Sequence, residues 1–383
     1  MMSAIWRPTA VVLSAALFLT AGAAGLAAQE LADRDPGDII SVEEVGEWSI
    51  AEIEEAGPRL FEWYGTPEAQ YPVAEYVVYY RTSDFDGEPV EAKSRLFVPL
   101  LPEADARPVL VFGSGTTGVA DRCAPSLEQP EVERWGYYRT NMASYAAQGI
   151  ITIFPDYIGF NDRERAQRYF SKAAEAHLLL DGARAVRRFL AGRDFRVEAA
   201  DAVFTAGYSQ GGHAALAAAD LYEDYAPDVD LRGAIGFAAT NDVMTLMQEA
   251  AYYSPYIIYA YRAMYGFEEI DPAAYLQDEW LENLTLDIAT KCVKEMEVYY
   301  PFDGRELFTE DFYAALHGGT LAEEYPDFYR RLAENESGLS GHDVPVLMVQ
   351  GGNDIIITTP AIRSYIGELC ATGVPVQYRL YED

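Results

Sequence analysis

Short apolar runs alternate with longer amphipathic segments along most of the chain. The apolar runs predict buried strands, which are expected at residues 75–81, 92–98, 108–112, 150–154, 203–208, 233–237, 344–349 and 375–380. The amphipathic segments predict helices, which are expected at residues 39–63, 137–148, 171–190, 214–220 and 359–371. The first two strands form a hairpin around Asp84-Phe85-Asp86-Gly87. The alternation that follows indicates a parallel sheet with helices on both faces.

This alternation is interrupted at residues 240–339, which contain no apolar run typical of a buried strand and are rich in Tyr, Met and Glu. About a hundred helical residues inserted after a sheet strand predict a cap over an active site. Most of the tyrosines in the cap are expected in ordinary helix packing. The predicted organisation is a core in two parts, 39–239 and 340–383, with the cap at 240–339 between them.

The N-terminal segment, residues 1–28, is typical of an export signal. Arg7 is followed by an apolar, alanine-rich stretch, and small residues near position 28 offer cleavage sites. The stretch is about long enough to span a bilayer, so an uncleaved anchor is the alternative. No other segment has the length of a transmembrane helix. We therefore expect a secreted or periplasmic protein with no integral membrane span after signal cleavage.

The charge balance is strongly acidic. The 383 residues include 28 Lys and Arg against 61 Asp and Glu, which gives a formal net charge of −33 at pH 7. Such a charge argues against nucleic acid and against anionic lipid surfaces as partners. Half of the residues are hydrophobic, which is enough for a sizeable core.

The most informative motif lies where the apolar run at 203–208 ends. Gly207-Tyr208-Ser209-Gln210-Gly211 has the pattern Gly-x-Ser-x-Gly, and an alanine-rich helical segment follows it. In a strand–turn–helix context, the turn holds the serine in a strained conformation with its hydroxyl exposed above the sheet. The N-terminus of the helix favours negative charge that develops there. We interpret Ser209 as a nucleophile, with a plain tight turn as the alternative.

A glycine-rich loop, Gly113-Ser114-Gly115-Thr116-Thr117-Gly118, follows the apolar run at 108–112. The loop lacks both the glycine spacing and the Gly-Lys-Ser/Thr ending of phosphate-binding loops. Where a nucleophilic serine is present, a loop in this place supplies a second backbone N–H donor for the oxyanion.

An acid and then a histidine are expected to follow the serine in chain order. Asp354, after the run at 344–349, is the candidate acid, and a turn aspartate that binds local N–H groups is the alternative. No histidine follows the last predicted strand. The four histidines of the chain are expected to be structural: His177, His213, His317 and His342. The simplest explanation is that the sequence stops just before its catalytic histidine, without which the serine hydroxyl is a poor nucleophile.

The chain resembles the secretory lipases, a family that includes the fungal lipase A type and bacterial relatives. The resemblance covers roughly residues 70–383 and rests on an ordered set of segments rather than on any one of them. The matching segments are Thr82 to Val90 running on to Val98-Pro99, Gly115 to Gly118, Asp121 to Ser126, Pro155 to Gly159, Gly207 to Gly212 and Gly351 to Asp354.

This resemblance implies an α/β-hydrolase fold with a helical cap, acting on a small-molecule or lipid ester without metal or cofactor. It implies Ser209 as the nucleophile and Asp354 as the acid, with the backbone N–H groups of Gln210 and Thr116 as oxyanion donors. The chain departs from the family at Ser114, where relatives usually have a histidine that supports the loop, and in the missing C-terminal histidine.

The chain has three cysteines, Cys123, Cys292 and Cys370. In the implied architecture, Cys123 follows the oxyanion loop and Cys292 lies in the cap, both near the mouth of the active site. We expect these two to be paired in an exported protein, and fungal relatives have a similar link. Two separate buried thiols are the alternative.

The sequence predicts an exported serine hydrolase that cleaves carboxylic esters through a Ser-His-Asp triad and an acyl-enzyme. An exported serine peptidase of the same fold is one alternative, because the serine motif does not distinguish the two. A non-catalytic binding protein that kept the fold and lost the triad histidine is another.

Overall fold

The computed structural model describes residues 29–60, 67–129, 135–162 and 164–382. Among the described residues, those from Pro36 onward form one compact unit, and residues 29–35 lie outside it. The predicted export signal at 1–28 lies outside the described residues. In the part of the chain that is described, no helix is long and apolar enough to cross a membrane.

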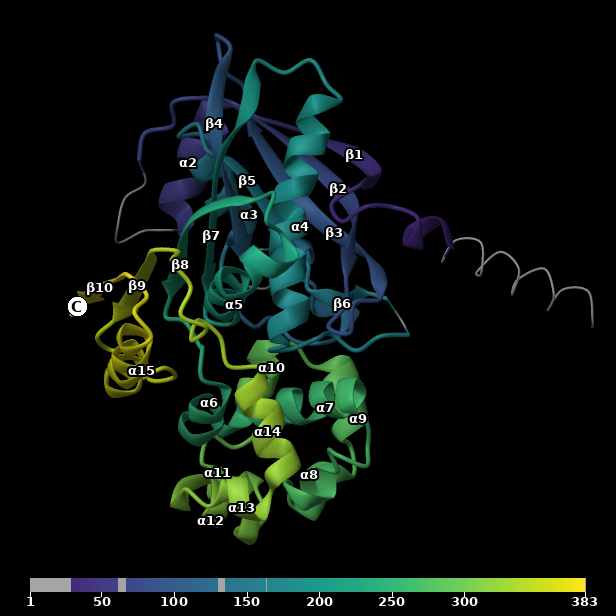
Figure 1. Cartoon of the computed structure of the whole chain (residues 1–383), viewed down its shortest axis with the longest axis vertical. Helices are drawn as coiled ribbons and strands as arrows, with labels where there is room; N and C mark the ends of the chain where they lie inside the picture. The colour runs from purple at the N-terminus through teal and green to yellow at the C-terminus, as the bar shows by residue number, and fades with distance from the viewer. Residues whose placement is uncertain (1–28, 61–66, 130–134, 163, 383) are drawn as a thin grey trace, which may run out of the picture. The chain divides into compact units, whose positions relative to one another are not determined.

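The compact unit is organised around one nine-stranded sheet with the order β1-β2-β3-β5-β4-β7-β8-β9-β10 (Figure 1). The strands are β1 (Ile39–Trp48), β2 (Val73–Ser83), β3 (Pro89–Pro99), β4 (Asp105–Gly113), β5 (Ile151–Pro155), β7 (Val197–Tyr208), β8 (Asp230–Phe237), β9 (Val346–Gly351) and β10 (Val376–Tyr381). The first three strands and β5 pair antiparallel, and the strands from β5 to β10 pair in parallel. A short strand, β6 (Ile158–Asn161), lies outside this sheet.

The segment at 39–63 differs from the expectation of a helix over its whole length. Residues 39–48 form edge strand β1, and only α2 (Ile50–Leu60) is helical. Residues 39–48 form a strand because they pair with β2. Trp48 anchors the end of β1, since its indole Nε1 donates to Glu75 Oε2 at 2.8 Å. The acidic side chains of β1 are largely exposed, and such charges protect a sheet edge from pairing with other chains.

Helices cover both faces of the sheet, as the alternation predicted (Figure 1). They are α3 (Tyr138–Ala146), α4 (Lys172–Ala191), α5 (Gln210–Tyr225) and α15 (Thr359–Ala371), together with α2. One buried cluster joins α4 and α5 to the sheet, and a second joins α2 and α3 to it. In α5 the buried stripe is mostly alanine, so this helix packs closely against β7 and β8.

Between β8 and β9 the chain forms only helices and turns apart from one isolated bridge, Leu276 to Phe308. This helical insertion comprises α6 (Val243–Glu249), α7 (Ser254–Tyr265), α8 (Asp278–Leu281), α9 (Leu284–Thr290), α10 (Val293–Tyr299), α11 (Gly304–Leu307), α12 (Glu310–Gly318), α13 (Leu321–Glu324) and α14 (Pro326–Glu334). In Figure 1 it lies below the sheet, coloured green. Its aromatic side chains pack on one another, and the rings of Tyr275 and Phe328 stack with centroids 4.5 Å apart. Much of the tyrosine content is therefore packing, as expected.

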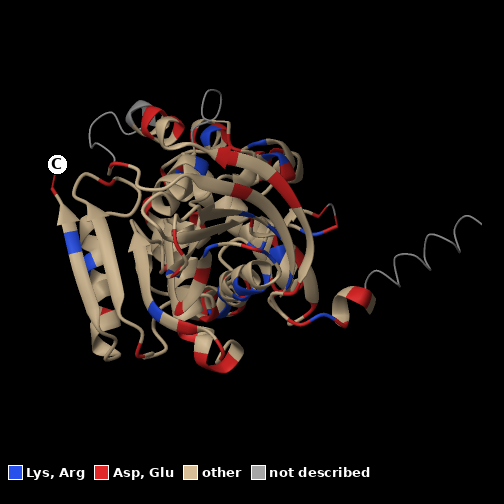
Figure 2. Cartoon of the chain, turned by 90° about the horizontal axis from the view of Figure 1, so that it is seen from above, with Lys and Arg blue, Asp and Glu red and all other residues tan. Residues whose placement is uncertain are grey.

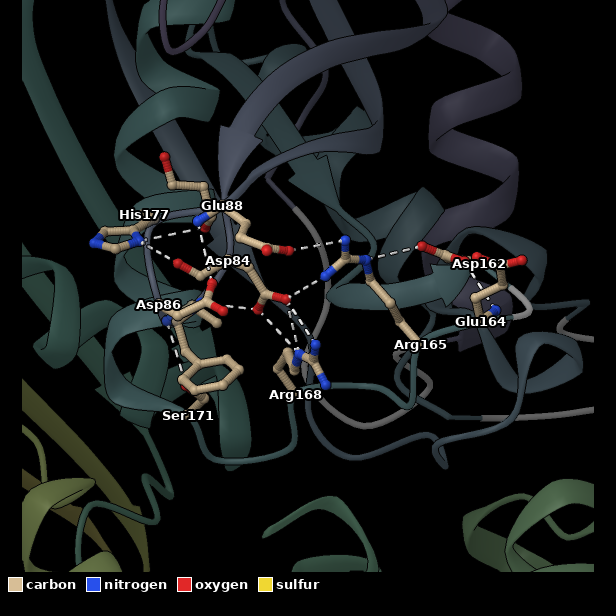
Figure 3. A network of polar contacts seen from close by, with 12 residues as sticks. Asp84, Asp86, Glu88, Asp162, Glu164, Arg165, Arg168, Ser171 and His177 are labelled. Atoms are coloured by element: carbon tan, nitrogen blue, oxygen red, sulfur yellow. Dashed lines mark hydrogen bonds and ion pairs between the residues drawn. The ribbon is translucent and has the colours of Figure 1, made fainter. Parts of the chain in front are cut away.

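Acidic side chains are distributed over many elements of the core (Figure 2). One of them, Asp84, is fully buried in the turn between β2 and β3 (Figure 3). Arg168 donates to both oxygens of its carboxylate, with Nε to Oδ1 at 2.9 Å and Nη2 to Oδ2 at 2.7 Å. Arg165 also donates to Oδ2, at 2.8 Å. These bonds attach the hairpin turn to residues 165–171, which lead into α4.

A disulfide joins Cys123 to Cys292, with the two Cα atoms 5.4 Å apart. Cys123 lies after the glycine-rich loop, and Cys292 caps the N-terminus of α10 in the helical insertion. The expected pairing is present. Cys370, on α15, is unpaired and exposed.

Candidate active site

Ser209 lies in the sharp turn between β7 and α5, with φ of 52° and ψ of −112°. This is a conformation that a residue other than glycine rarely adopts, so the surrounding packing must hold it in place. The two motif glycines, Gly207 and Gly211, allow the strand and the helix to approach closely enough to form this turn. A Cβ at Gly211 would lie 1.9 Å from the Gly113 carbonyl oxygen, and one at Gly207 would lie 2.2 Å from the Gly211 backbone.

The backbone of the turn presents one free donor beside the serine. Ser209 N–H donates to the Phe237 carbonyl at 2.9 Å, and the Ser209 carbonyl accepts from Gly212 at 2.9 Å. Gln210 is the first residue of α5, and its N–H donates to no described residue. The Ser209 hydroxyl lies 3.4 Å from the Thr240 hydroxyl.

Three tyrosine hydroxyls form hydrogen bonds with the glycine-rich loop after β4. Tyr138 accepts from Gly115 N–H at 2.8 Å, Tyr157 donates to the Ser114 carbonyl at 2.6 Å, and the Tyr169 hydroxyl lies 2.7 Å from Thr116 Oγ1. The buried Ser114 hydroxyl has no hydrogen-bond partner among the described residues, so its side chain does not support the loop. The N–H of Thr116 makes no hydrogen bond within the described chain.

Asp354 follows β9 in the segment that leads to α15. Its Oδ1 accepts from the backbone N–H groups of Ile356 at 2.9 Å and Ile357 at 3.0 Å. This is the local turn role that the sequence offered as an alternative. It leaves Oδ2 without a hydrogen-bond partner among the described residues, so one carboxylate oxygen is fixed and the other is available.

A cavity of about 60 Å³ brings three of the four predicted site residues together. Thr116, Ser209 and Asp354 all line it, and the fourth, Gln210, is buried next to Ser209 in the chain. The remaining lining residues come from the core and from the helical insertion: Trp135, Tyr208, Ala238, Tyr253, Val293, Lys294, Glu297, Ile356 and Ile357.

None of the four histidines lines this cavity. His213 is fully buried between α4 and the end of α14, and His177 stacks on Tyr225 with ring centroids 3.9 Å apart. His317 packs on Tyr313 within the insertion, and His342 is buried ahead of β9. None of the four imidazole rings therefore reaches the cavity that Ser209 lines.

The sequence predicted a cap over the active site but did not identify the side chains that the helical insertion contributes to the cavity. Tyr253, Lys294 and Glu297 reach it from η3 (Ala251–Tyr253) and α10. Burial raises the pKa of Tyr253 well above its ordinary value, so its hydroxyl stays protonated and able to donate. The only sequence signal for these residues was that they lie in the predicted cap, and this signal does not single out individual side chains.

The comparisons with known proteins agree with this fold. The family model described as secretory lipase matches residues 135–381. The chain is 23% identical to "Secreted triacylglycerol lipase LIP5" of Malassezia furfur over 328 residues, covering 79% of this chain and 78% of the relative. It is 24% identical to "Lipase A" of Arthroderma benhamiae, covering 80% of this chain and 65% of that relative.

Solved structures show the same architecture. The rice cell wall degrading esterase LipA from Xanthomonas oryzae superposes with a TM-score of 0.72 at 19% identity, covering 91% of both chains. Candida antarctica lipase A superposes with a TM-score of 0.67 at 19% identity, covering 92% of this chain and 78% of the other. The fold is that of the α/β-hydrolases, as expected. The chain belongs to the secretory lipase family, a class of carboxylic ester hydrolases.

Proposed function

We propose that this chain is an exported serine esterase or lipase that cleaves carboxylic esters through an acyl-enzyme. The observation that carries the proposal is the single cavity lined by Ser209, Thr116 and Asp354, with the serine in a strained strand–helix turn. One relative is named a triacylglycerol lipase and one solved structure is a rice cell wall degrading esterase, which supports a small-molecule or lipid ester as the substrate. Export rests on the N-terminal pattern and on the word "secreted" in the relatives' names.

In the proposed mechanism, Ser209 Oγ attacks the ester carbonyl carbon and its proton passes to a histidine base. The free N–H groups of Gln210 and Thr116 donate to the oxyanion. The oxyanion then collapses, the alcohol leaves with a proton from the imidazolium, and Ser209 keeps the acyl group. Water attacks the acyl-enzyme in the same way and releases the acid. Asp354 orients the imidazole and stabilises its protonated form.

The base in this mechanism is proposed to come from the chain that leaves β10. Tyr381 pairs in parallel with Gly351, and its carbonyl accepts from Gly352 N–H at 2.6 Å. The end of β10 is therefore bonded to Gly352, which precedes Asp354 by two residues in the chain. Reading the gene beyond residue 383 tests this step directly.

A second candidate function is a binding protein of this fold without a catalytic base. One observation favours it: none of the histidines of this chain lies in the Ser209 cavity. The two candidates differ in their reaction with a fluorophosphonate, which labels only an activated serine.

The test uses protein expressed from the complete reading frame, assayed on p-nitrophenyl esters of increasing acyl length. We expect Ser209→Ala to lower kcat by a factor on the order of 10⁴ or more and to abolish fluorophosphonate labelling. Asp354→Asn should cost on the order of 10³ to 10⁴ in kcat because the imidazole takes the wrong tautomer. Ser364→Ala, on the exposed face of α15, is the matched control and should keep full activity. Activity retained in folded Ser209→Ala would overturn the proposed mechanism.

A further inference from the structure

A buried carboxylate lies beneath the nucleophile turn, and the proposed reaction does not use it. Glu175, on α4, is 1% exposed and forms no ion pair with a Lys or Arg in the described part of the chain. Its two oxygens contact α5 instead. Oε1 accepts from the side-chain Nε2 of Gln210 at 2.7 Å, and Oε2 lies 2.5 Å from Nδ1 of His213.

The hydrogen-bond partners of His213 show where the protons of the Glu175–His213 pair lie. Nε2 lies 2.6 Å from the carbonyl oxygen of Asn335, which can only accept, so Nε2 carries a hydrogen. Nδ1 and the Glu175 oxygen, 2.5 Å apart, also require a proton between them. His213 and Glu175 together therefore form an electrically neutral, fully hydrogen-bonded unit, which is how a buried carboxylate is tolerated.

This unit connects the proposed oxyanion donor to the helical insertion. At one end, Glu175 fixes the side chain of Gln210, whose N–H points away from α5 as one of its unpaired first donors. At the other end, Asn335 follows α14, and its Nδ2 donates to the Tyr265 hydroxyl on α7 at 2.8 Å. Asn335 Oδ1 also accepts from Lys172 N–H at the start of α4 at 2.9 Å.

We propose that Glu175, supported by His213, is a positioning residue that orients the Gln210 N–H toward the oxyanion and couples it to the docked insertion. The proposal rests on the proposed function, since it assigns a supporting role at the same site. An N–H that is misdirected stabilises the transition state less and barely changes binding of the ground-state ester. Removing the Glu175 acceptor is therefore expected to lower kcat and to leave KM nearly unchanged.

Two variants of one residue separate this role from simple stability. Glu175→Leu removes both acceptors, and we expect kcat to fall about tenfold to a hundredfold with KM changed less than about threefold. Glu175→Gln keeps every bond: its amide oxygen accepts from Gln210, and its amide N–H donates to the unprotonated Nδ1 of a neutral His213. We expect this conservative variant to retain kcat within about threefold.

The matched control is Asp181→Leu, which removes another fully buried carboxylate from the same helix. Asp181 binds Thr82, Tyr225 and Arg184, so its loss should lower the thermal unfolding midpoint while kcat of the folded enzyme stays the same. If Glu175→Leu does not fold, Gln210→Leu breaks the same contact from the other side and should lower kcat equally. In the double variant Glu175→Leu/Gln210→Leu, the loss should not exceed that of one variant alone.

Folded Glu175→Leu with kcat within a factor of about two of the parent enzyme would overturn the positioning role. So would Glu175→Gln that is as slow as Glu175→Leu. Ser209→Ala in the same assay distinguishes failure of the positioning role from failure of the proposed mechanism. If Ser209→Ala is inactive and Glu175→Leu is fully active, only the positioning role fails; if Ser209→Ala is active, the proposed mechanism fails.

Discussion

At the scale of single residues, the site depends on positions where no other side chain fits. Gly211 lies against the Gly113 carbonyl, and this contact aligns the serine turn with the glycine-rich loop, so that the free N–H groups of Gln210 and Thr116 occur on neighbouring segments. The hydroxyls of Tyr138, Tyr157 and Tyr169 then fix the loop. Strain at Ser209 is tolerated because its backbone is bonded on both sides.

A pH effect on stability is expected from another residue, Glu336, which follows α14. Burial, and then the charges of Asp242 and Glu368, raise the pKa of Glu336 to about 7 from its ordinary value of 4.5. Between these two values the folded protein holds a proton that the unfolded chain has lost, so stability falls as pH rises through the window and levels off above it. Because the side chain is partly exposed, we discount the full shift to about 1–2 kcal/mol.

Urea unfolding of Glu336→Gln at about pH 5 and about pH 8 measures this effect. The variant should be more stable than the parent by about 1–2 kcal/mol at the higher pH and nearly equal to it at the lower pH. Glu323→Gln, an exposed change on α13, should follow the parent at both values. Parallel behaviour of the two variants would contradict the assignment.

At the scale of elements, buried ion pairs attach loops to the sheet. Asp84 in the β2–β3 turn is the clearest case, because Arg168 and Arg165 both depend on it (Figure 3). Asp84→Ala leaves the nearly buried Arg168 without its carboxylate, which should cost about 3–5 kcal/mol in the free energy of unfolding. Glu88→Ala removes a carboxylate that is 63% exposed and 3.4 Å from Arg165, and it should cost less than about 1 kcal/mol. Equal urea midpoints for the two variants would refute the distinction.

At the scale of the whole molecule, the disulfide Cys123–Cys292 crosslinks the core to the helical insertion across 169 residues. A crosslink that closes such a long loop restricts the unfolded chain, so Cys123→Ser/Cys292→Ser should lose about 2–5 kcal/mol of stability. Cys370→Ser changes an exposed, unpaired cysteine and should leave stability unaltered. Calorimetry with and without dithiothreitol provides the measurement: the reductant should lower the unfolding temperature of the parent and of Cys370→Ser, but not that of the double serine variant. An unfolding temperature of the parent that is insensitive to complete reduction would contradict this role.

Most of the architecture could be predicted from the sequence, because it depends on local chemistry. Of the four predicted site residues, Thr116, Ser209 and Asp354 line one cavity. Period-two and apolar runs specify buried strands, and Gly207 and Gly211 around Ser209 specify a tight strand–helix turn within five residues. Asp354 was placed by its position after a strand that the pattern identified. The helix predicted at 39–63 was wrong over residues 39–48, because pairing with β2, rather than local preference, makes that part a strand.

What only the tertiary structure decided lies in contacts between residues far apart in the chain. The tyrosines that bond to the Thr116 loop come from other segments of the core. The approach of Lys294 and Glu297 to the Ser209 cavity, and the bond from His213 to Asn335 across 122 residues, depend on how the insertion docks. No local pattern encodes such contacts, because each side chain is as compatible with an ordinary helix interior as with a functional role. The sequence by itself determined the fold, the tight turn around Ser209 and the candidate acid. The tertiary structure decided what surrounds them, since burial and hydrogen-bond partners arise only when the layers pack.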